Sequence, residues 1–237
     1  MRRILIVNAD DFGLSGGVNR GVARAHDEGI VTSTSAMVRR DAIDEAAQLA
    51  RERPKLSVGL HVDLSEWVYH DGEWVPLYEV VVAEDRAAVE AEVAAQLAGF
   101  VPLFGRQPTH LDSHQHRHLD EPVRSVVVET GRRLGIPVRG CTPGIEYRGD
   151  FYGQIGTGEP FPEAITVDAL LRLLTSLPEG VTELGCHPAV EPVEGSSYSS
   201  ERPVELGVLC DSRVRAAVRS EDIELVSFGE LSGSVGT

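Results

Sequence analysis

Hydrophobic and polar positions follow two alternating patterns along this chain. Short strand-like segments, several of them continuous apolar runs typical of strands buried on both faces, lie at residues 4–7, 33–38, 57–62, 109–112, 136–139, 181–186 and 223–228. Between them, apolar residues recur at helical spacing and predict helices over residues 18–25, 42–52, 83–99, 120–135, 167–177 and 211–219. Residues 67–79 and 148–161 fit neither pattern, and we expect both to be surface loops.

Strands that alternate with helices predict an α/β fold in which parallel strands are joined by helical crossovers. About seven strands fit either a (β/α) barrel slightly short of the usual eight strands or an open, doubly wound sheet. No GxGxxG motif follows the first strand, which removes the main argument for a dinucleotide-binding fold. Neither a linker nor an internal repeat interrupts the pattern, so we expect residues 1–237 to form a single domain.

The composition of the chain argues against some classes of binding partner and of cellular location. The chain has 22 basic and 37 acidic residues and a formal net charge of -15, which opposes binding to nucleic acid or to an anionic membrane surface. The first apolar run is too short for a signal peptide or a membrane span, and we expect no other stretch to be long enough. Three cysteines without a CxxC motif indicate a reducing compartment, the cytoplasm.

Polar residues that could carry chemistry gather at the carboxyl ends of the predicted strands. Asp10 and Asp11 end the first strand, His61 the third, His114 follows the fourth, and His187 ends the sixth. In a (β/α) barrel this edge is where catalytic groups converge. Adjacent buried carboxylates are costly unless they are paired or bind a metal, although one of the two could instead cap the following helix.

The histidines strengthen the metal interpretation. A lone His61 in an apolar strand would more often be a core residue, but residues 109–118 hold four further histidines interleaved with an aspartate. Imidazole is the commonest transition-metal ligand in proteins, and this segment therefore predicts a metal site without selecting among its histidines. Cys186 and His187 are adjacent on a strand and point to opposite faces, so we expect Cys186 in the core and His187 in an acid or base role at the rim.

Six segments together carry a family resemblance: residues 8–15, 29–34, 59–61, 103–106, 109–114 and 186–189. In this order and combination they resemble the YdjC-like family of carbohydrate deacetylases, which includes the chitooligosaccharide deacetylases. The resemblance implies an irregular (β/α) barrel like that of polysaccharide deacetylases, with a metal at its carboxyl-end rim. By position it implies metal ligation by Asp11, His61 and His114, a general base at Asp10 and a general acid at His187. His116 and His118 would then lie behind the ligands or on the substrate side.

The resemblance also implies a function and partners. The chain would be a metal-dependent hydrolase that removes acetyl groups from small N-acetylated sugars. Its cofactor would be one divalent ion, with Mg and Zn as the first candidates. A homodimer is implied as well. Residues 65–82 depart from the chitooligosaccharide enzymes and look shorter, which leaves the identity of the sugar open.

Two other functions compete with this interpretation. A metal-dependent phosphoesterase would need basic side chains for phosphate, and the candidates are Arg117, Arg139 and Arg148. A non-catalytic sugar-binding protein could use a platform of loop aromatics, formed by Trp67, Trp74, Tyr147 and Tyr152. Binding alone does not require the adjacent aspartates, so this last alternative is the weakest.

Overall fold

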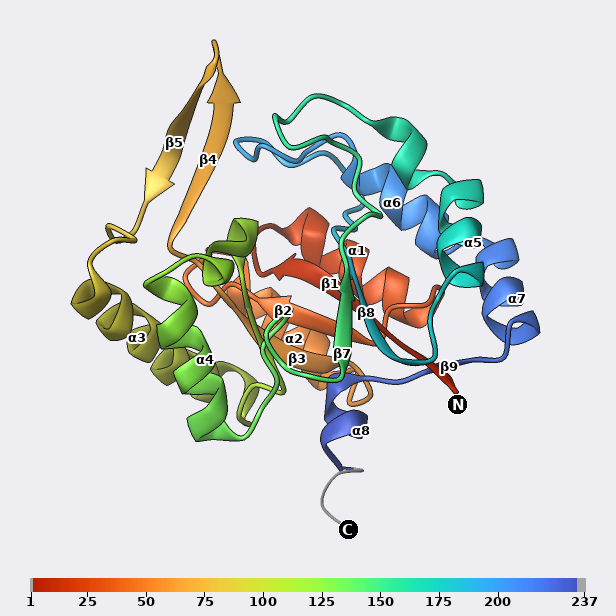
Figure 1. The fold of residues 1–237 in the computed structure, drawn as a ribbon, viewed down its shortest axis with the longest axis horizontal. Helices are drawn as coiled ribbons and strands as arrows, with labels where there is room; N and C mark the ends of the chain where they lie inside the picture. The colour runs from red at the N-terminus through yellow and green to blue at the C-terminus, as the bar shows by residue number, and fades with distance from the viewer. Residues whose placement is uncertain (1, 234–237) are drawn as a thin grey trace.

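The central element of the fold is a parallel sheet that curls into a half-barrel, seen in a computed structural model that describes residues 2–233 (Figure 1). Its strand order is β6-β3-β2-β1-β8-β7, and β9 pairs with the first half of β1. The strands are β1 (Arg3–Phe12), β2 (Ser33–Ala36), β3 (Ser57–Val62), β6 (Leu111–Ser113), β7 (Ile145–Arg148), β8 (Gly180–Cys186) and β9 (Ile223–Leu225). The predicted α/β architecture of about seven parallel strands is confirmed.

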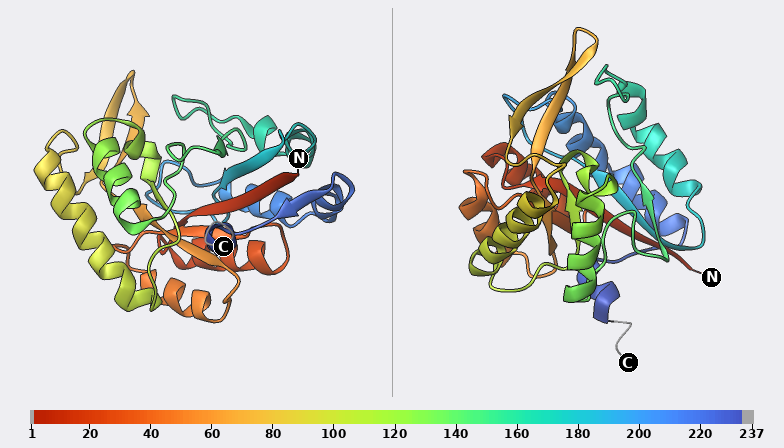
Figure 2. Two further views of the ribbon diagram at one scale, coloured as in Figure 1. Left: turned by 60° about the horizontal axis from the view of Figure 1, so that its bottom comes forward. Right: turned by 60° about the vertical axis from the view of Figure 1, so that its left-hand side comes forward.

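Helices cover the outside of this sheet. They are α1 (Gly16–Asp27), α2 (Ile43–Arg51), α3 (Arg86–Phe104), α4 (Val123–Leu134), α5 (Val167–Thr175), α6 (Arg202–Leu209), α7 (Ser212–Ser220) and α8 (Phe228–Gly233), with 3-10 turns η1 (His114–Leu119) and η2 (Pro162–Ile165). Figure 2 shows α3 beside α4 on one flank and α5 beside α7 on the other. Strand β1, in the middle of the sheet, is buried from Leu5 onward, as its apolar run predicts.

Side-chain caps fix where several helices begin. The Ser15 hydroxyl accepts the Val18 N–H at the start of α1, and the Asp85 carboxylate accepts two N–H groups at the start of α3. Because Ser15 caps α1, the alternative in which Asp10 or Asp11 caps this helix is wrong.

The first predicted loop, residues 67–79, is instead an antiparallel hairpin of β4 (Ser65–His70) and β5 (Glu73–Glu79). It projects from the body of the molecule (Figure 1). Asp71 and Gly72 form the turn with φ values of 51° and 90°. An Asp-Gly pair favours such positive φ values and is a strong hairpin signal, so the expectation of a loop overlooked local evidence.

Three further expectations need correction. Residues 136–139 form only a single bridge, between Val138 and Leu111, and the fifth strand of the sheet is β7, which ends where the second predicted loop begins. Helix α6 occupies a segment for which we expected no element. The last predicted strand ends at Leu225 because α8 begins at Phe228.

Helix α3 also differs from expectation, because its length and composition alone would allow it to cross a membrane. In this fold α3 packs against β3, α2 and α4 and buries Val89, Val93 and Phe100. Its Glu92 pairs with Arg39, and its Glu90 pairs with Arg86. The helix is therefore packed against the half-barrel along the side that carries Val89, Val93 and Phe100.

Candidate active site

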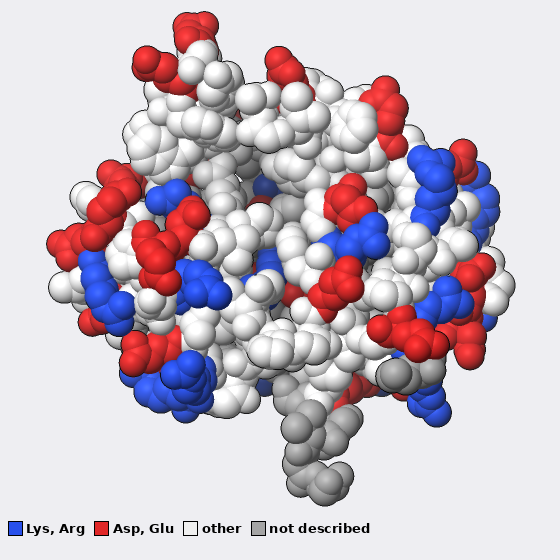
Figure 3. Space-filling model, in the orientation of Figure 1, with Lys and Arg blue, Asp and Glu red and all other residues white. Residues whose placement is uncertain are grey.

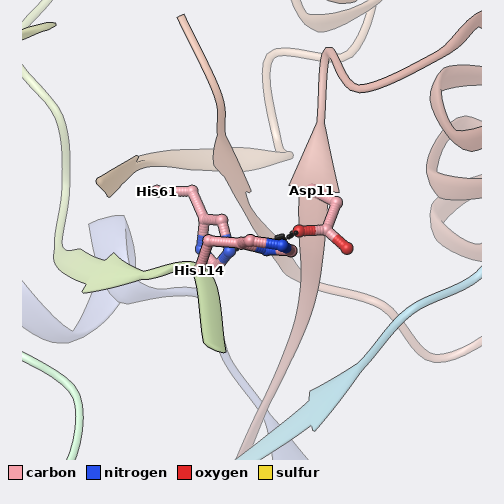
Figure 4. Close-up of side chains that lie close together, drawn as sticks. All are labelled: Asp11, His61 and His114. Carbon is pink, nitrogen blue, oxygen red and sulfur yellow. Dashed lines mark hydrogen bonds and ion pairs between the residues drawn. The ribbon is translucent and has the colours of Figure 1, made fainter. Parts of the chain in front are cut away.

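Three side chains from three strand ends converge at the carboxyl edge of the sheet (Figure 4). Asp11 lies in β1, His61 in β3, and His114 directly after β6. The Asp11 Oδ1 atom is 3.2 Å from His61 Nε2 and 3.0 Å from His114 Nδ1, and all three residues are buried. The sequence expectation that these residues lie together is thereby met.

An irregularity in β1 brings both aspartates to this edge. Between the pairs Ala9–Thr34 and Phe12–Ala36, β1 advances three residues while β2 advances two, so β1 contains a bulge. Asp11 has a φ of 69°, a left-handed conformation that is rare for a residue other than glycine and is found where surrounding contacts enforce it. As a result, Asp10 and Asp11 each place a carboxylate oxygen within 4.8 Å of a His61 nitrogen.

Each of the three side chains is held from behind by one charged partner. His61 Nδ1 lies 2.8 Å from Asp112 Oδ1, which leaves Nε2 facing Asp11. His114 Nε2 lies 3.4 Å from Glu66 Oε2, and Arg202 donates to Asp11 Oδ2 at 2.7 Å. Carboxylates that orient metal-binding histidines in this way are typical of metal sites.

The electrostatic environment between Asp11, His61 and His114 favours a positive charge. Burial disfavours a charged imidazole, yet the Asp11 carboxylate raises the pKa of His114 to about 9. Burial likewise opposes the charge on Asp11, but Arg202 and His114 hold its pKa well below the usual range. Two imidazoles and one carboxylate that face one another form the donor set of catalytic divalent-metal sites, so these residues fit such an ion.

A second group of donor atoms, from Asp10, His61 and Asp112, already has its cation. The Arg139 guanidinium donates to both Asp10 oxygens, at 2.6 and 2.7 Å, and lies 2.9 Å from Asp112 Oδ2. Although burial raises the pKa of Asp10, Arg139 outweighs this effect and lowers it. Among the described residues, the group around Asp11 is therefore the better candidate for a metal.

Arg139 has a third buried partner, because its Nε donates to Glu183 Oε1 at 2.6 Å. Burial is the largest influence on this carboxyl and raises the pKa of Glu183 from 4.5 to about 7. Between about pH 4.5 and about pH 7 the folded protein therefore holds a proton that the unfolded chain has released. We expect the free energy of unfolding to fall as pH rises through this window, and Glu183→Gln to remove this part of the fall.

Urea unfolding at several pH values across the window measures this effect. Glu73→Gln, a change at an exposed carboxylate of the hairpin, is the control and should follow the wild type. Equal pH slopes for the wild type and Glu183→Gln would contradict the assignment.

His187 faces the same point from β8. Its Nε2 is 3.7 Å from Asp10 Oδ2, and its ring packs against the stacked pair of Tyr152 and Tyr198 at centroid distances of 5.3 and 5.2 Å. The His187 backbone N–H donates to Glu205, whose carboxylate is buried. The preceding Cys186 is fully buried, so the expected division between a core cysteine and a rim histidine is confirmed.

The other histidines of residues 109–118 have different surroundings. His110 stacks on Phe228 in the core, where burial lowers its pKa to about 4. His118 is held by the Ser113 hydroxyl and the Arg139 carbonyl. His116 lies 3.2 Å from the Tyr147 hydroxyl and lines the cavity described next. Of this segment, His114 is the histidine that meets Asp11.

A cavity of about 750 Å³ opens over these residues. Its walls include the four aromatics that the sequence suggested as a sugar platform, Trp67, Trp74, Tyr147 and Tyr152. The β4–β5 hairpin forms one wall, and residues 149–158 form another. Figure 3 shows this hollow near the middle of one face, with charges of both signs scattered around it and no single basic patch.

Sequence reasoning missed two residues that contact the three candidate metal ligands. Glu66 lies in β4, one residue before the segment expected to be a loop, and Arg202 begins the unexpected helix α6. Pro203, in the first turn of α6, was the available helix-start signal. Arg202 meets Asp11 across a separation of 191 residues, and no local pattern indicates such a contact.

Comparison with solved structures shows the fold class to which the protein belongs. A candidate cellobiose-phosphate cleavage protein from Enterococcus faecalis V583 superimposes with a TM-score of 0.79 at 26% identity, covering 98% of this chain and 99% of that one. A family 4 carbohydrate esterase from Streptomyces lividans, solved with acetate, gives 0.56 at 12% identity and covers 95% and 91%. The chain thus has the irregular α/β barrel fold of the polysaccharide deacetylases.

Sequence comparisons then give the family. The profile of the YdjC-like proteins matches residues 4–220, and the chain belongs to this family. A carbohydrate deacetylase from Geobacillus stearothermophilus is 36% identical, with 98% of this chain and 99% of the relative covered. A chitooligosaccharide deacetylase from Klebsiella pneumoniae (strain 342) is 35% identical, with 98% and 100% covered.

Proposed function

We propose that this protein is a metal-dependent carbohydrate deacetylase that hydrolyses the acetamide of small N-acetylated sugars. The observation that carries the proposal is the arrangement of Asp11, His61 and His114 beside Asp10 and His187, beneath a cavity with aromatic walls. The names of the relatives, a carbohydrate deacetylase and a chitooligosaccharide deacetylase, support the same reaction.

In this proposal Asp11, His61 and His114 hold one divalent ion. Two nitrogen donors suit Zn and similar transition metals better than Mg, which prefers oxygen ligands. When bound, such an ion supplies Lewis acidity toward the amide carbonyl and toward water. Asp112, Glu66 and Arg202 keep the three side chains turned toward one another.

Asp10 serves as the general base. Its low pKa keeps the carboxylate ionised near neutral pH, and the two bonds from Arg139 fix its orientation. His187 serves as the general acid that donates a proton from Nε2 to the leaving amine. Because Asp10 Oδ2 and His187 Nε2 are 3.7 Å apart, a single amide can reach both groups. The stacked rings of Tyr152 and Tyr198 contact the imidazole and help to hold its orientation.

The phosphoesterase alternative loses support because its candidate cations have carboxylate partners. Arg139 is buried among Asp10, Asp112 and Glu183, and Arg148 pairs with Asp150 at 2.5 Å. Arg117 lies 3.7 Å from Asp120. A phosphate in the cavity would have to compete with these carboxylates for the three arginines.

An acetate-release assay tests the proposal. We expect the purified protein, supplied in turn with Zn, Mn, Co, Ni and Mg, to release acetate from N-acetylated mono- or oligosaccharides. A chelator should abolish release, and the effective metal should restore it, because three protein ligands leave coordination positions open for reactants. Phosphate release from a generic phosphate ester would favour the phosphoesterase. Sugar binding without acetate release would favour the binding protein.

We also propose that the protein acts in the cytoplasm as a homodimer. All three cysteines are free thiols, which supports a reducing compartment. The homodimer rests on the family resemblance.

A further inference from the structure

One side-chain amide joins the backbone of the β4–β5 hairpin to the body of the protein. Gln115 Oε1 accepts the Trp67 N–H at 2.8 Å, and Gln115 Nε2 donates to the Trp67 carbonyl at 2.7 Å. The amide therefore pairs with both backbone groups of one residue, as a neighbouring strand would. Within the described residues, Trp67 is the outermost position at which the hairpin hydrogen-bonds to the rest of the fold.

The backbone at Gln115 explains how this amide reaches the hairpin. Gln115 has φ 49° and ψ 30°, and the next residue, His116, is also left-handed. Two consecutive left-handed residues other than glycine are rare and persist only where the surroundings enforce them. This turn directs the Gln115 side chain to the hairpin, whereas the preceding His114 faces Asp11.

A second contact joins the same two segments. Glu66 precedes Trp67 in β4, and its Oε2 lies 3.4 Å from His114 Nε2. Its other oxygen accepts the Ser197 N–H at 2.7 Å, which ties the loop after β8 to the same place. Adjacent residues of β4 thus contact adjacent residues of η1. The same pair of contacts therefore fixes the position of the hairpin and the orientation of the His114 imidazole.

The hairpin presents aromatic rings to the cavity. Trp67, Tyr69 and Trp74 line it, and Tyr69 and Trp74 pack edge to face with centroids 5.5 Å apart. Trp74 is 50% exposed and Tyr69 is 37% exposed, so both rings are accessible to a ligand in the cavity. Flat aromatic faces of this kind suit the apolar faces of sugar rings.

We propose that Gln115 is a positioning residue that holds this aromatic wall in register with His114. The inference rests on the proposed function: a sugar ring stacked on the hairpin places its acetamide above Asp11 only if the hairpin is fixed relative to the site. Gln115 itself touches neither the donor atoms nor, in this proposal, the reacting group. Its effect on the reaction passes through Trp67.

The chain offers a direct probe of the hairpin. Trp67 and Trp74 are its only two tryptophans, and they lie in β4 and β5, so tryptophan fluorescence reports on this element alone. Gln115→Asn keeps an amide and a residue type that tolerates left-handed φ, but its side chain is one methylene shorter and cannot span both Trp67 groups. This substitution removes the paired hydrogen bonds between the Gln115 amide and the Trp67 backbone without adding backbone strain.

In metal-loaded Gln115→Asn we expect stronger acrylamide quenching of tryptophan fluorescence than in the wild type. We also expect KM for an N-acetylated disaccharide to rise about tenfold, as the loss of one or two net hydrogen bonds would give, with kcat changed less than about threefold. Gln48→Asn, which alters an exposed amide bonded to Glu52, is the matched control and should leave both quantities unchanged.

Quenching and KM equal to those of the wild type would overturn the proposal, and so would increased quenching with unchanged KM. The fluorescence arm also separates this proposal from the proposed function. If the wild type released no acetate, the proposed function would fail. A fluorescence titration with the disaccharide would then decide the role of Gln115, because unchanged sugar affinity in Gln115→Asn would overturn it and weaker affinity would support it.

Discussion

Asp10→Asn is expected to lower kcat for acetate release by about 10²- to 10⁴-fold, the usual contribution of a positioned general base. An amide cannot accept the proton that the carboxylate takes, and its NH₂ group would oppose one of the Arg139 donors. The donor atoms of Asp11, His61 and His114 are not altered, so metal content should stay at the wild-type level. Steady-state kinetics together with elemental analysis of the same preparation measure both quantities.

The control for this change is Asp85→Asn, which alters an aspartate at the start of α3 that does not line the cavity. Asn caps helices about as well as Asp, so α3 should keep its N-terminal bonds and activity should be unchanged. Full activity in Asp10→Asn would show that Asp10 is not the base. A parallel loss of metal would show that Asp10 contributes to metal binding.

The second large effect is expected on stability, at Arg139. Replacing this side chain by Met leaves the carboxylates of Asp10, Asp112 and Glu183 buried without their cation. Removing one partner from a buried ionic group typically costs about 3 to 5 kcal/mol, and we expect Arg139→Met to lower the free energy of unfolding by this amount. Denaturant unfolding monitored by circular dichroism measures the loss.

Two further variants complete the test of this prediction, one as a control and one for the case in which Arg139→Met does not fold. Arg213→Met removes an arginine from an exposed pair with Asp211 and should leave the free energy of unfolding close to that of the wild type. If Arg139→Met does not fold in isolation, Arg139→Lys retains the charge but not the planar fork and should give a smaller, measurable loss. An Arg139→Met protein as stable as Arg213→Met would contradict a structural role for the buried guanidinium.

The strand ends of the site could be predicted from the sequence because they depend only on the order of elements. Once residues 4–7 and 57–62 are recognised as parallel strands, Asp11 and His61 must lie at the same edge of the sheet. His114 is different. The side chains of His114 and His116 have different surroundings because the backbone at Gln115 and His116 is left-handed. No pattern of hydrophobic positions encodes this conformation, so the family resemblance was needed to select His114.

The supporting residues were harder to predict for a physical reason. Glu66 and Arg202 act through contacts between distant segments, and a contact of that kind has no signature in the residues next to it. The hairpin was missed because both faces of β5 are largely exposed, which removes the alternation of apolar and polar positions that marks a half-buried strand. The turn residues Asp71 and Gly72 were the remaining local signal.

The bulge in β1 has a consequence for how this segment can vary in length. Between Ala9 and Phe12 the strand holds one residue more than its partner β2. Deleting that residue would restore regular pairing, and neighbouring side chains would then point to opposite faces of the sheet. Asp10 and Asp11 could no longer both approach His61. Single substitutions at this point remove one chemical group, whereas a deletion would disperse the whole cluster, so the length of this segment is constrained as tightly as its residue types.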